Sequence, residues 1–103
     1  VIEEFGFPRD GFQFKQGTTT HSRDAYYSHV FGRIAKAAQE DGLLAGLNFW
    51  GWGGIGRPTA NDWQPGMDYL CDPPHEPQGW YSVFDTDDTT LRIIRDAARK
   101  VSK

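Results

Sequence analysis

The sequence has 103 residues, of which 38% are hydrophobic and 24% charged, and its formal net charge is −3. It lacks the basic excess of nucleic-acid-binding proteins, and it has no run of about 18 apolar residues that could span a bilayer. We therefore expect neither a nucleic acid nor a membrane as its partner. Its single cysteine, Cys71, rules out an intrachain disulfide. Aromatic residues make up 15% of the chain, and the four tryptophans fall mostly in loop-like sequence. This distribution favours a surface that binds a flat ligand.

The first six residues predict a short strand with two carboxylates near its C-terminal end. Buried carboxylates are costly unless they are paired or used, and α/β barrels keep catalytic groups at the C-terminal ends of their strands. Glu3 and Glu4 must face opposite ways in an extended strand, and Gly6 leaves the backbone free to turn away beyond Glu4. Glu4 is therefore the candidate catalytic residue. The alternative is that both acids pair with a basic neighbour.

A helix is predicted from Arg23 to about residue 41, with Ser22 as its N-cap and Gly42 as its C-terminal stop. Residues 43–50 are nearly all apolar and bounded by glycine, which predicts a strand covered on both faces. Strand, helix and strand together form a βαβ unit, which is right-handed by default. The helix should bury an apolar stripe of Tyr27, Val30, Phe31, Ile34, Ala35 and Ala38.

Residues 51–87 show neither helical nor alternating periodicity and are rich in proline and glycine. Ordered loops of this length are usually functional. The chain then predicts a second helix from Thr89 to about Val101. Its inward-facing residues should be Leu91, Ile94, Ala97, Ala98 and Val101.

Two strands and two helices cannot close a sheet or shield both of its faces. We therefore expect an α/β fold in which residues 1–103 form the last quarter of one (β/α)8 TIM barrel of roughly 250 or more residues. A piece of a longer protein is also suggested by a sequence that starts within a predicted strand.

Three further motifs favour structural interpretations. The Gly-x-Gly-x-x-Gly pattern at residues 51–56 is followed by Pro58 and more loop, whereas a dinucleotide site needs a helix there. The segment from Cys71 to Glu76 has metal-capable side chains but no second cysteine pair, so a structural loop is favoured over a metal site. The acids at residues 85–88 lack the glycine of a calcium loop, and Asp87 or Asp88 is expected to cap the second helix.

The aromatic residues of the last strand and the long loop either pack the loop or stack on sugars. Indole rings pack against the C–H faces of pyranoses, and Trp50 is the strongest case because it ends a strand that lines the expected barrel mouth. The candidate substrate-binding residues are Trp50, Trp52, Trp63 and Trp80, with Tyr69 and Tyr81 beside them.

Three segments together resemble the C-terminal part of endo-β-1,4-mannanases of glycoside hydrolase family 5. They are the Glu-Glu-Phe-Gly strand end at residues 3–6, the stretch at 46–54, and the long motif at 72–85 that ends in Ser-Val-Phe-Asp. The resemblance implies a (β/α)8 barrel of which this chain supplies strands seven and eight with their helices. It also implies retaining endo-hydrolysis of mannan, galactomannan or glucomannan by double displacement, without metal or cofactor.

In this family pattern Glu4 is the nucleophile and Trp50 is the platform beneath the sugar whose bond is cut. The acid/base glutamate would lie on the fourth strand, upstream of this sequence. Two alternatives stay open: a non-catalytic carbohydrate-binding domain that uses its aromatic surface, and a β-glucanase or cellulase of the same barrel type. A secreted or periplasmic location is expected from the function alone.

Overall fold

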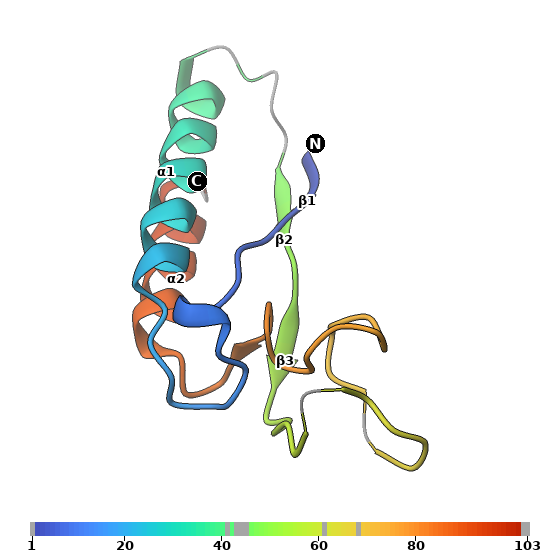
Figure 1. Ribbon diagram of the computed structural model, residues 1–103. Helices are drawn as coiled ribbons and strands as arrows, with labels where there is room; N and C mark the ends of the chain where they lie inside the picture. Colours follow the sequence, from blue (N-terminus) through green and yellow to red (C-terminus); the bar gives the residue numbers. More distant parts are fainter. Residues whose placement is uncertain (1, 41, 43–45, 61, 68, 102–103) are drawn as a thin grey trace.

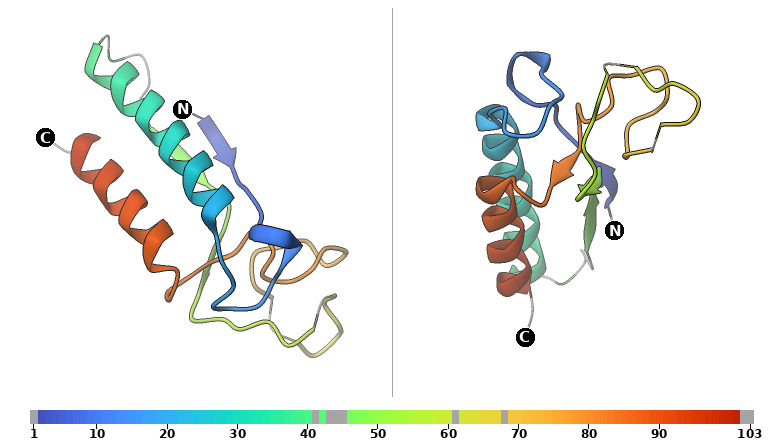
Figure 2. Two further views of the ribbon diagram at one scale, coloured as in Figure 1. Left: turned by 60° about the vertical axis from the view of Figure 1, so that its left-hand side comes forward. Right: turned by 90° about the horizontal axis from the view of Figure 1, so that it is seen from below.

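The computed structural model describes residues 2–40, 42, 46–60, 62–67 and 69–101. Two helices lie side by side and run in the same direction, opposite to that of the strands beside them (Figures 1 and 2). A long looped segment extends away from the helices and strands, at the C-terminal ends of the strands (Figure 1). This arrangement of strands on one side and helices on the other is that of consecutive βα units.

Strand β1 (Ile2–Phe5) pairs in parallel with β2 (Leu47–Phe49), with Ile2 opposite Leu47 and Phe5 opposite Phe49. The Ile2 amide donates to the carbonyl of Gly46 over 3.1 Å. The strand–helix–strand order predicted from the sequence is therefore confirmed. Predicted strand residues 1 and 43–45 lie outside the described residues.

Helix α1 (His21–Glu40) begins before the predicted Arg23, and the prediction of Ser22 as N-cap is wrong. Asp10, from a short 3-10 turn (η1, Asp10–Phe12), supplies the cap instead. Its carboxylate accepts the backbone N–H groups of His21 at 2.7 Å and Ser22 at 3.0 Å. A distant acid thus takes the place of a local cap, which sequence spacing does not reveal. At the other end, Gly42 has a φ of +70°, as a helix-stopping glycine should.

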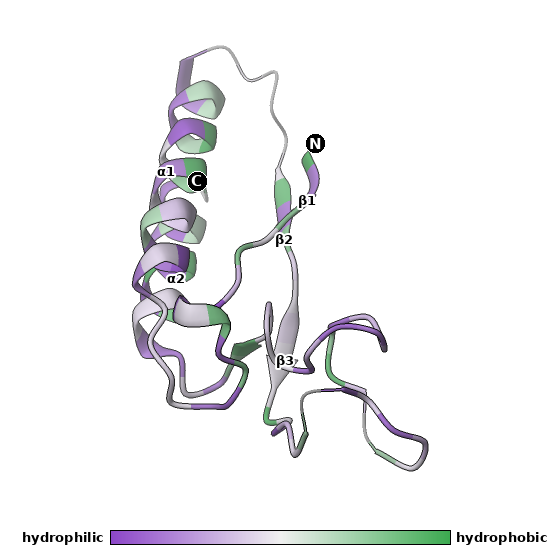
Figure 3. Cartoon of the chain, viewed as in Figure 1, coloured by the Kyte–Doolittle hydropathy of each residue, from purple (hydrophilic) through white to green (hydrophobic). Residues whose placement is uncertain are grey.

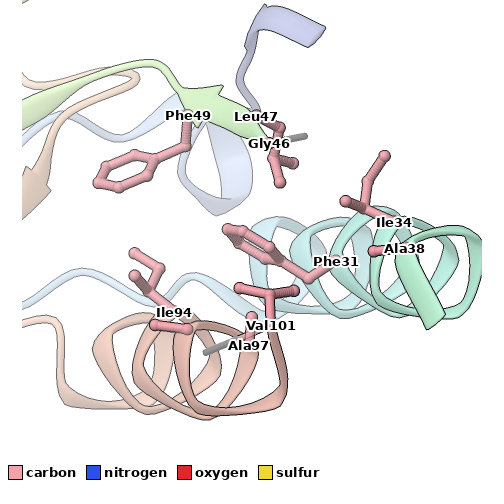
Figure 4. A pocket seen from close by; sticks show the side chains of 10 residues that line it. Phe31, Ile34, Ala38, Gly46, Leu47, Phe49, Ile94, Ala97 and Val101 are labelled. Atoms are coloured by element: carbon pink, nitrogen blue, oxygen red, sulfur yellow. The ribbon is translucent and has the colours of Figure 1, made fainter. Parts of the chain in front are cut away.

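Helix α2 (Asp88–Val101) packs against α1. Hydrophobic residues of α1 lie mainly on the side that faces the strands (Figure 3), and Tyr27, Ile34 and Ala35 are buried as predicted. In α2, however, Ala97 is buried whereas Ala98 and Val101 are exposed, which corrects the predicted inward face. Both exposed residues border an open apolar groove between the helices and β2; it is lined by Phe31, Ile34, Ala38, Gly46, Leu47, Phe49, Ile94, Ala97, Ala98 and Val101 (Figure 4).

The lack of periodicity in the segment after β2 predicted a wholly irregular loop, and this prediction is wrong in part. Strand β3 (Trp52–Gly54) pairs in parallel with β4 (Val83–Phe84), although each is too short to leave a periodic signal. The close approach requires a glycine, because a Cβ at Gly53 would lie 2.9 Å from that of Ser82. A turn, not a helix, follows Gly54, as expected for a false dinucleotide motif.

Candidate active site

The ends of β1 and β2 place Glu4 and Trp50 around one open hollow of about 490 Å³. The parallel pairing brings them there, because the Trp50 amide donates to the Phe5 carbonyl over 2.6 Å and so aligns the two strand ends. Both side chains are exposed to solvent and accessible to a ligand. The hollow is lined by Glu4, Phe5, Gly6, Trp50, Pro73, Glu76 and Tyr81.

Glu3 and Glu4 are both exposed, but Glu4 lines the hollow and Glu3 is not among its lining residues. This difference follows from the alternation of side chains along a strand. Of the two acids, Glu4 is thus the one that shares the hollow with Trp50 at the C-terminal edge of the parallel pair.

The backbone of Trp50 is held from two sides. The hydroxyl of buried Tyr27, on α1, donates to the Trp50 carbonyl over 3.2 Å. Burial raises the pKa of Tyr27 far above its ordinary value, so this hydroxyl keeps the proton that it donates. On the other side Gly6 fits against the same carbonyl, because an added Cβ would lie only 2.8 Å from that oxygen. The peptide bond between Trp50 and Gly51 is cis.

The loop that forms the far wall of the hollow is organised around buried Asp72. Its carboxylate accepts the backbone N–H groups of Gly79 and Tyr81 and the hydroxyl of Ser82, each at 2.8 Å. Gln78, also buried, donates its side-chain amide to the carbonyls of Asp72 at 2.9 Å and Pro73 at 3.0 Å. The structural interpretation of this motif agrees with these contacts, and a wall residue such as Tyr81 is fixed through its backbone.

Cys71 borders this loop and lies 3.0 Å from the hydroxyl of Ser82. Burial raises the pKa of its thiol to about 11, so the group is protonated and unreactive near neutral pH. Among the described residues, no three His, Cys, Asp or Glu side chains come together as a metal site would require. No helix in the described part of the chain is long and apolar enough to cross a membrane.

Behind the site lies a buried ionic cluster formed by Arg9, Arg23 and Asp87. Both guanidinium groups contact the Asp87 carboxylate, Arg23 at 3.4 Å, and both donate to the carbonyl of Ser82. Burial lowers the pKa of Arg23, and the nearby charge of Arg9 lowers it further. Asp87 also accepts the Phe84 amide at 2.8 Å. Asp87, one of the two acids predicted to cap the second helix, therefore uses its side chain to bind β4 and the two arginines.

The other predicted sugar-binding tryptophans do not line the hollow. Trp52 is 56% exposed on β3, and Trp63 stacks on Tyr69 with ring centroids 4.8 Å apart in the long loop. Trp80 packs between Phe12 and Tyr81, at 5.3 and 5.5 Å. Trp80 thus supports a wall residue of the hollow, and the role of these three residues in sugar binding stays a prediction.

The arrangement can perform a limited chemistry: an accessible carboxylate beside an exposed indole ring can attack an electrophilic carbon of a ligand that packs on the ring. Sequence reasoning found both of these groups but missed Glu76, although it lies within a motif that was singled out for other reasons. It placed Tyr27 in the apolar stripe of the helix but missed its bond to Trp50, and it missed Arg9 and Arg23. These contacts are made across long stretches of sequence and leave no local pattern.

Comparison with known proteins shows the family of the chain. A family model described as "GH family 5 beta-mannosidase-like" matches residues 1–103. The chain belongs to glycoside hydrolase family 5. A comparison with curated proteins finds no match.

Among solved structures, the family 5 mannosidase of Rhizomucor miehei is 40% identical, with a TM-score of 0.83. Two glutamate-to-alanine variants of that enzyme are 38% identical, with TM-scores of 0.83 and 0.82, and the second is in complex with mannosyl-fructose. In each case the match covers 98% of this chain and 26% of the other. The chain thus spans about a quarter of the length of these family 5 enzymes and shares the α/β fold of that quarter.

Proposed function

We propose that this chain carries the nucleophile of a retaining hydrolase of β-mannosidic bonds, and that Glu4 is that nucleophile. The observation that carries the proposal is that Glu4 and Trp50 line one hollow at the C-terminal ends of two adjacent parallel strands. Membership of family 5 supports a glycosidic substrate, and the mannosidase relatives support a mannoside.

The rest of the fold is proposed to be a (β/α)8 barrel, with β1 and β2 as its seventh and eighth strands. Two observations support this. The chain covers 26% of the length of its relatives, and α1 connects two parallel strands, as in a barrel repeat. The hollow at the strand ends would then belong to the mouth of the barrel, where such enzymes keep their active sites.

The mechanism that fits this placement is double displacement. Glu4 attacks the anomeric carbon and forms a glycosyl-enzyme, while a second glutamate protonates the departing glycosidic oxygen. The second glutamate then activates a water molecule that releases the sugar with net retention. We expect this partner upstream of the present sequence, with its carboxyl group about 5–5.5 Å from that of Glu4.

We further propose that the substrate is a β-1,4-mannan, galactomannan or glucomannan, which the enzyme cuts within its backbone. The enzyme would then act outside the cytoplasm, because intact polysaccharides do not cross the cell membrane. The motif at residues 72–85 supports this choice. A second candidate, release of terminal mannose, is favoured by the description of the matching family model and by the relative that binds mannosyl-fructose. Products from mannohexaose separate the two: internal cleavage gives mixed oligosaccharides at once, and terminal cleavage gives mannose first. Parallel assays on cellohexaose address a β-glucanase.

The nucleophile is tested by Glu4→Gln in the full-length enzyme. Turnover should fall by several orders of magnitude while mannooligosaccharide binding persists, because the amide cannot form the covalent intermediate. Glu3→Gln is the matched control, since this neighbour is also exposed but is not among the lining residues of the hollow. Near-normal activity of Glu4→Gln would refute the assignment. If the unmodified full-length protein binds mannosides but shows no turnover, the chain belongs to a non-catalytic carbohydrate-binding protein instead.

A further inference from the structure

Arg23 is buried in the first turn of α1, and its guanidinium group binds the backbone next to two lining residues of the hollow. Its Nε atom donates to the carbonyl of Phe7 over 3.2 Å, and a terminal nitrogen donates to the carbonyl of Ser82 over 3.1 Å. Phe7 follows the lining residue Gly6, and Ser82 follows the lining residue Tyr81. One side chain thus joins the segment that leaves β1 to the loop wall.

The two joined segments are also in close contact with each other. A Cβ added at Gly6 would lie 3.3 Å from the ring of Tyr81 and 2.8 Å from the carbonyl oxygen of Trp50. The chain is therefore tightly packed only two residues beyond Glu4. Because close-packed protein transmits strain, a shift of the loop wall against Gly6 would move the chain next to Glu4 as well.

The bonds of Arg23 require a guanidinium group. All three of its nitrogen atoms have partners, since the remaining one lies 3.4 Å from the carboxylate of Asp87. A guanidinium group donates along fixed directions from one plane, whereas a lysine ammonium is a single point charge on a flexible stem. A lysine at this position would reach one carbonyl or the carboxylate, but it would not hold both carbonyls at a fixed separation.

Arg9 offers a comparison within the same buried cluster. It contacts the same Asp87 carboxylate and donates to the same Ser82 carbonyl, over 3.3 Å. Its other guanidinium bond goes to the carbonyl of Thr18 at 3.0 Å, in the loop before α1. Within the described part of the chain, the Arg9 guanidinium therefore makes no bond to the backbone beside Gly6. The two arginines share their acid and differ in the segments that they join.

We propose that Arg23 is a positioning residue for the reaction: by joining these two backbone segments, it holds the nucleophile Glu4 in place relative to the loop wall. The inference rests on the proposed function, since it takes Glu4 as the nucleophile. Arg23 acts only through Glu4 and does not touch the substrate. The rate of the reaction should therefore depend on it more than binding does, because a displacement of about 1 Å can cost about 100-fold in rate.

Kinetics of the full-length enzyme test this role. Arg23→Lys and Arg23→Gln should lower kcat on mannohexaose about 10- to 100-fold and change KM by less than about threefold. Arg23→Gln leaves the buried pair of Asp87 and Arg9 intact, so it serves if the lysine variant does not fold. Arg9→Lys is the matched control, which should lower the melting temperature similarly but leave kcat within about threefold. Melting curves set an assay temperature at which each variant is folded.

A second comparison separates positioning from a general loss of structure. Adding Arg23→Gln to Glu4→Gln should leave the residual turnover within about threefold, because no nucleophile remains to be placed. A loss by the same factor with and without Glu4→Gln would overturn the inference. So would an unchanged kcat in both Arg23 variants, or an equal loss of kcat in Arg9→Lys. Near-normal activity of Glu4→Gln alone would instead refute the proposed nucleophile, and Arg23 would then have no catalytic group to position.

Discussion

The hydroxyl of Tyr27 donates a hydrogen bond to the backbone carbonyl of Trp50 over 3.2 Å. Tyr27 lies in the first half of α1 and Trp50 directly follows β2, so this bond ties a lining residue of the hollow to the helix. The Tyr27 ring also contacts the rings of Phe5 and Phe49, one on each strand of the parallel pair. The two strand ends and the helix are thus held by one side chain.

Tyr27→Phe removes this bond and leaves the ring in place. The Trp50 carbonyl loses a buried donor, so we expect a loss of about 1 kcal/mol in the free energy of unfolding, together with a higher KM as the indole loosens. Urea unfolding and steady-state kinetics of the full-length enzyme measure the two effects. Tyr26→Phe is the control, because Tyr26 lies one position away on α1 and is exposed. Equal effects of both substitutions would show that the bond to Trp50 is unimportant.

Gly6→Ala should impair activity by displacing Trp50. The new methyl carbon would lie 2.8 Å from the Trp50 carbonyl oxygen, and a backbone group cannot give way as a flexible side chain can. We expect kcat/KM to fall at least tenfold, with the free energy of unfolding reduced by about 1–3 kcal/mol. Gly32→Ala is the contrasting variant: among the described residues its methyl group meets nothing within 4 Å, and alanine favours the helix by about 0.5–1 kcal/mol. The idea fails if Gly6→Ala retains full activity.

Asp87→Asn should be among the most destabilising substitutions of the chain. It leaves the buried guanidinium groups of Arg9 and Arg23 without their carboxylate, which costs about 3–5 kcal/mol. Asp85→Asn provides the comparison, because the Asp85–Arg57 pair is exposed, at 41% and 34%, and surface pairs contribute about 1 kcal/mol or less. Chemical denaturation of both variants measures the difference. Similar losses would mean that the buried cluster contributes no more than a surface pair.

Asp10→Ala should make the stability of the protein vary less with pH in the acid range, because Asp10 caps α1. Hydrogen bonds from the backbone of Ser22 first, then the Thr19 side chain and the His21 backbone, lower the Asp10 pKa well below its ordinary value of 3.8. Because the folded pKa is depressed, the stabilisation is complete above pH 3.8 and is lost as pH falls toward the folded pKa. The melting temperature of the variant should thus be lower than that of the native protein at pH 7, and this difference in melting temperature should be smaller at pH 3. Asp62→Ala, at an exposed loop position, should show no such gap.

The pairing of Glu4 with Trp50 could be predicted from sequence because parallel strands end at the same edge of a sheet. Each residue only had to be placed at the end of its own strand, and both apolar runs are clear. The position of Glu76 could not be predicted in this way, because buried side chains of Asp72 and Gln78 bind backbone groups of a non-periodic loop. Arg9 and Arg23 likewise lie in polar sequence that gives no sign of burial, and Asp87 reaches them from more than sixty residues away.

The anchoring of the loop wall has a consequence for redesign of the enzyme. The bonds made by Asp72 and Gln78 involve backbone groups of Pro73, Gly79 and Tyr81, so they do not depend on which side chain occupies position 76. The side chains at the tip of the loop can therefore be replaced without removing the bonds that hold its backbone. Libraries that vary positions 74–76 alone would sample new ligand preferences while leaving Glu4 and its strand untouched.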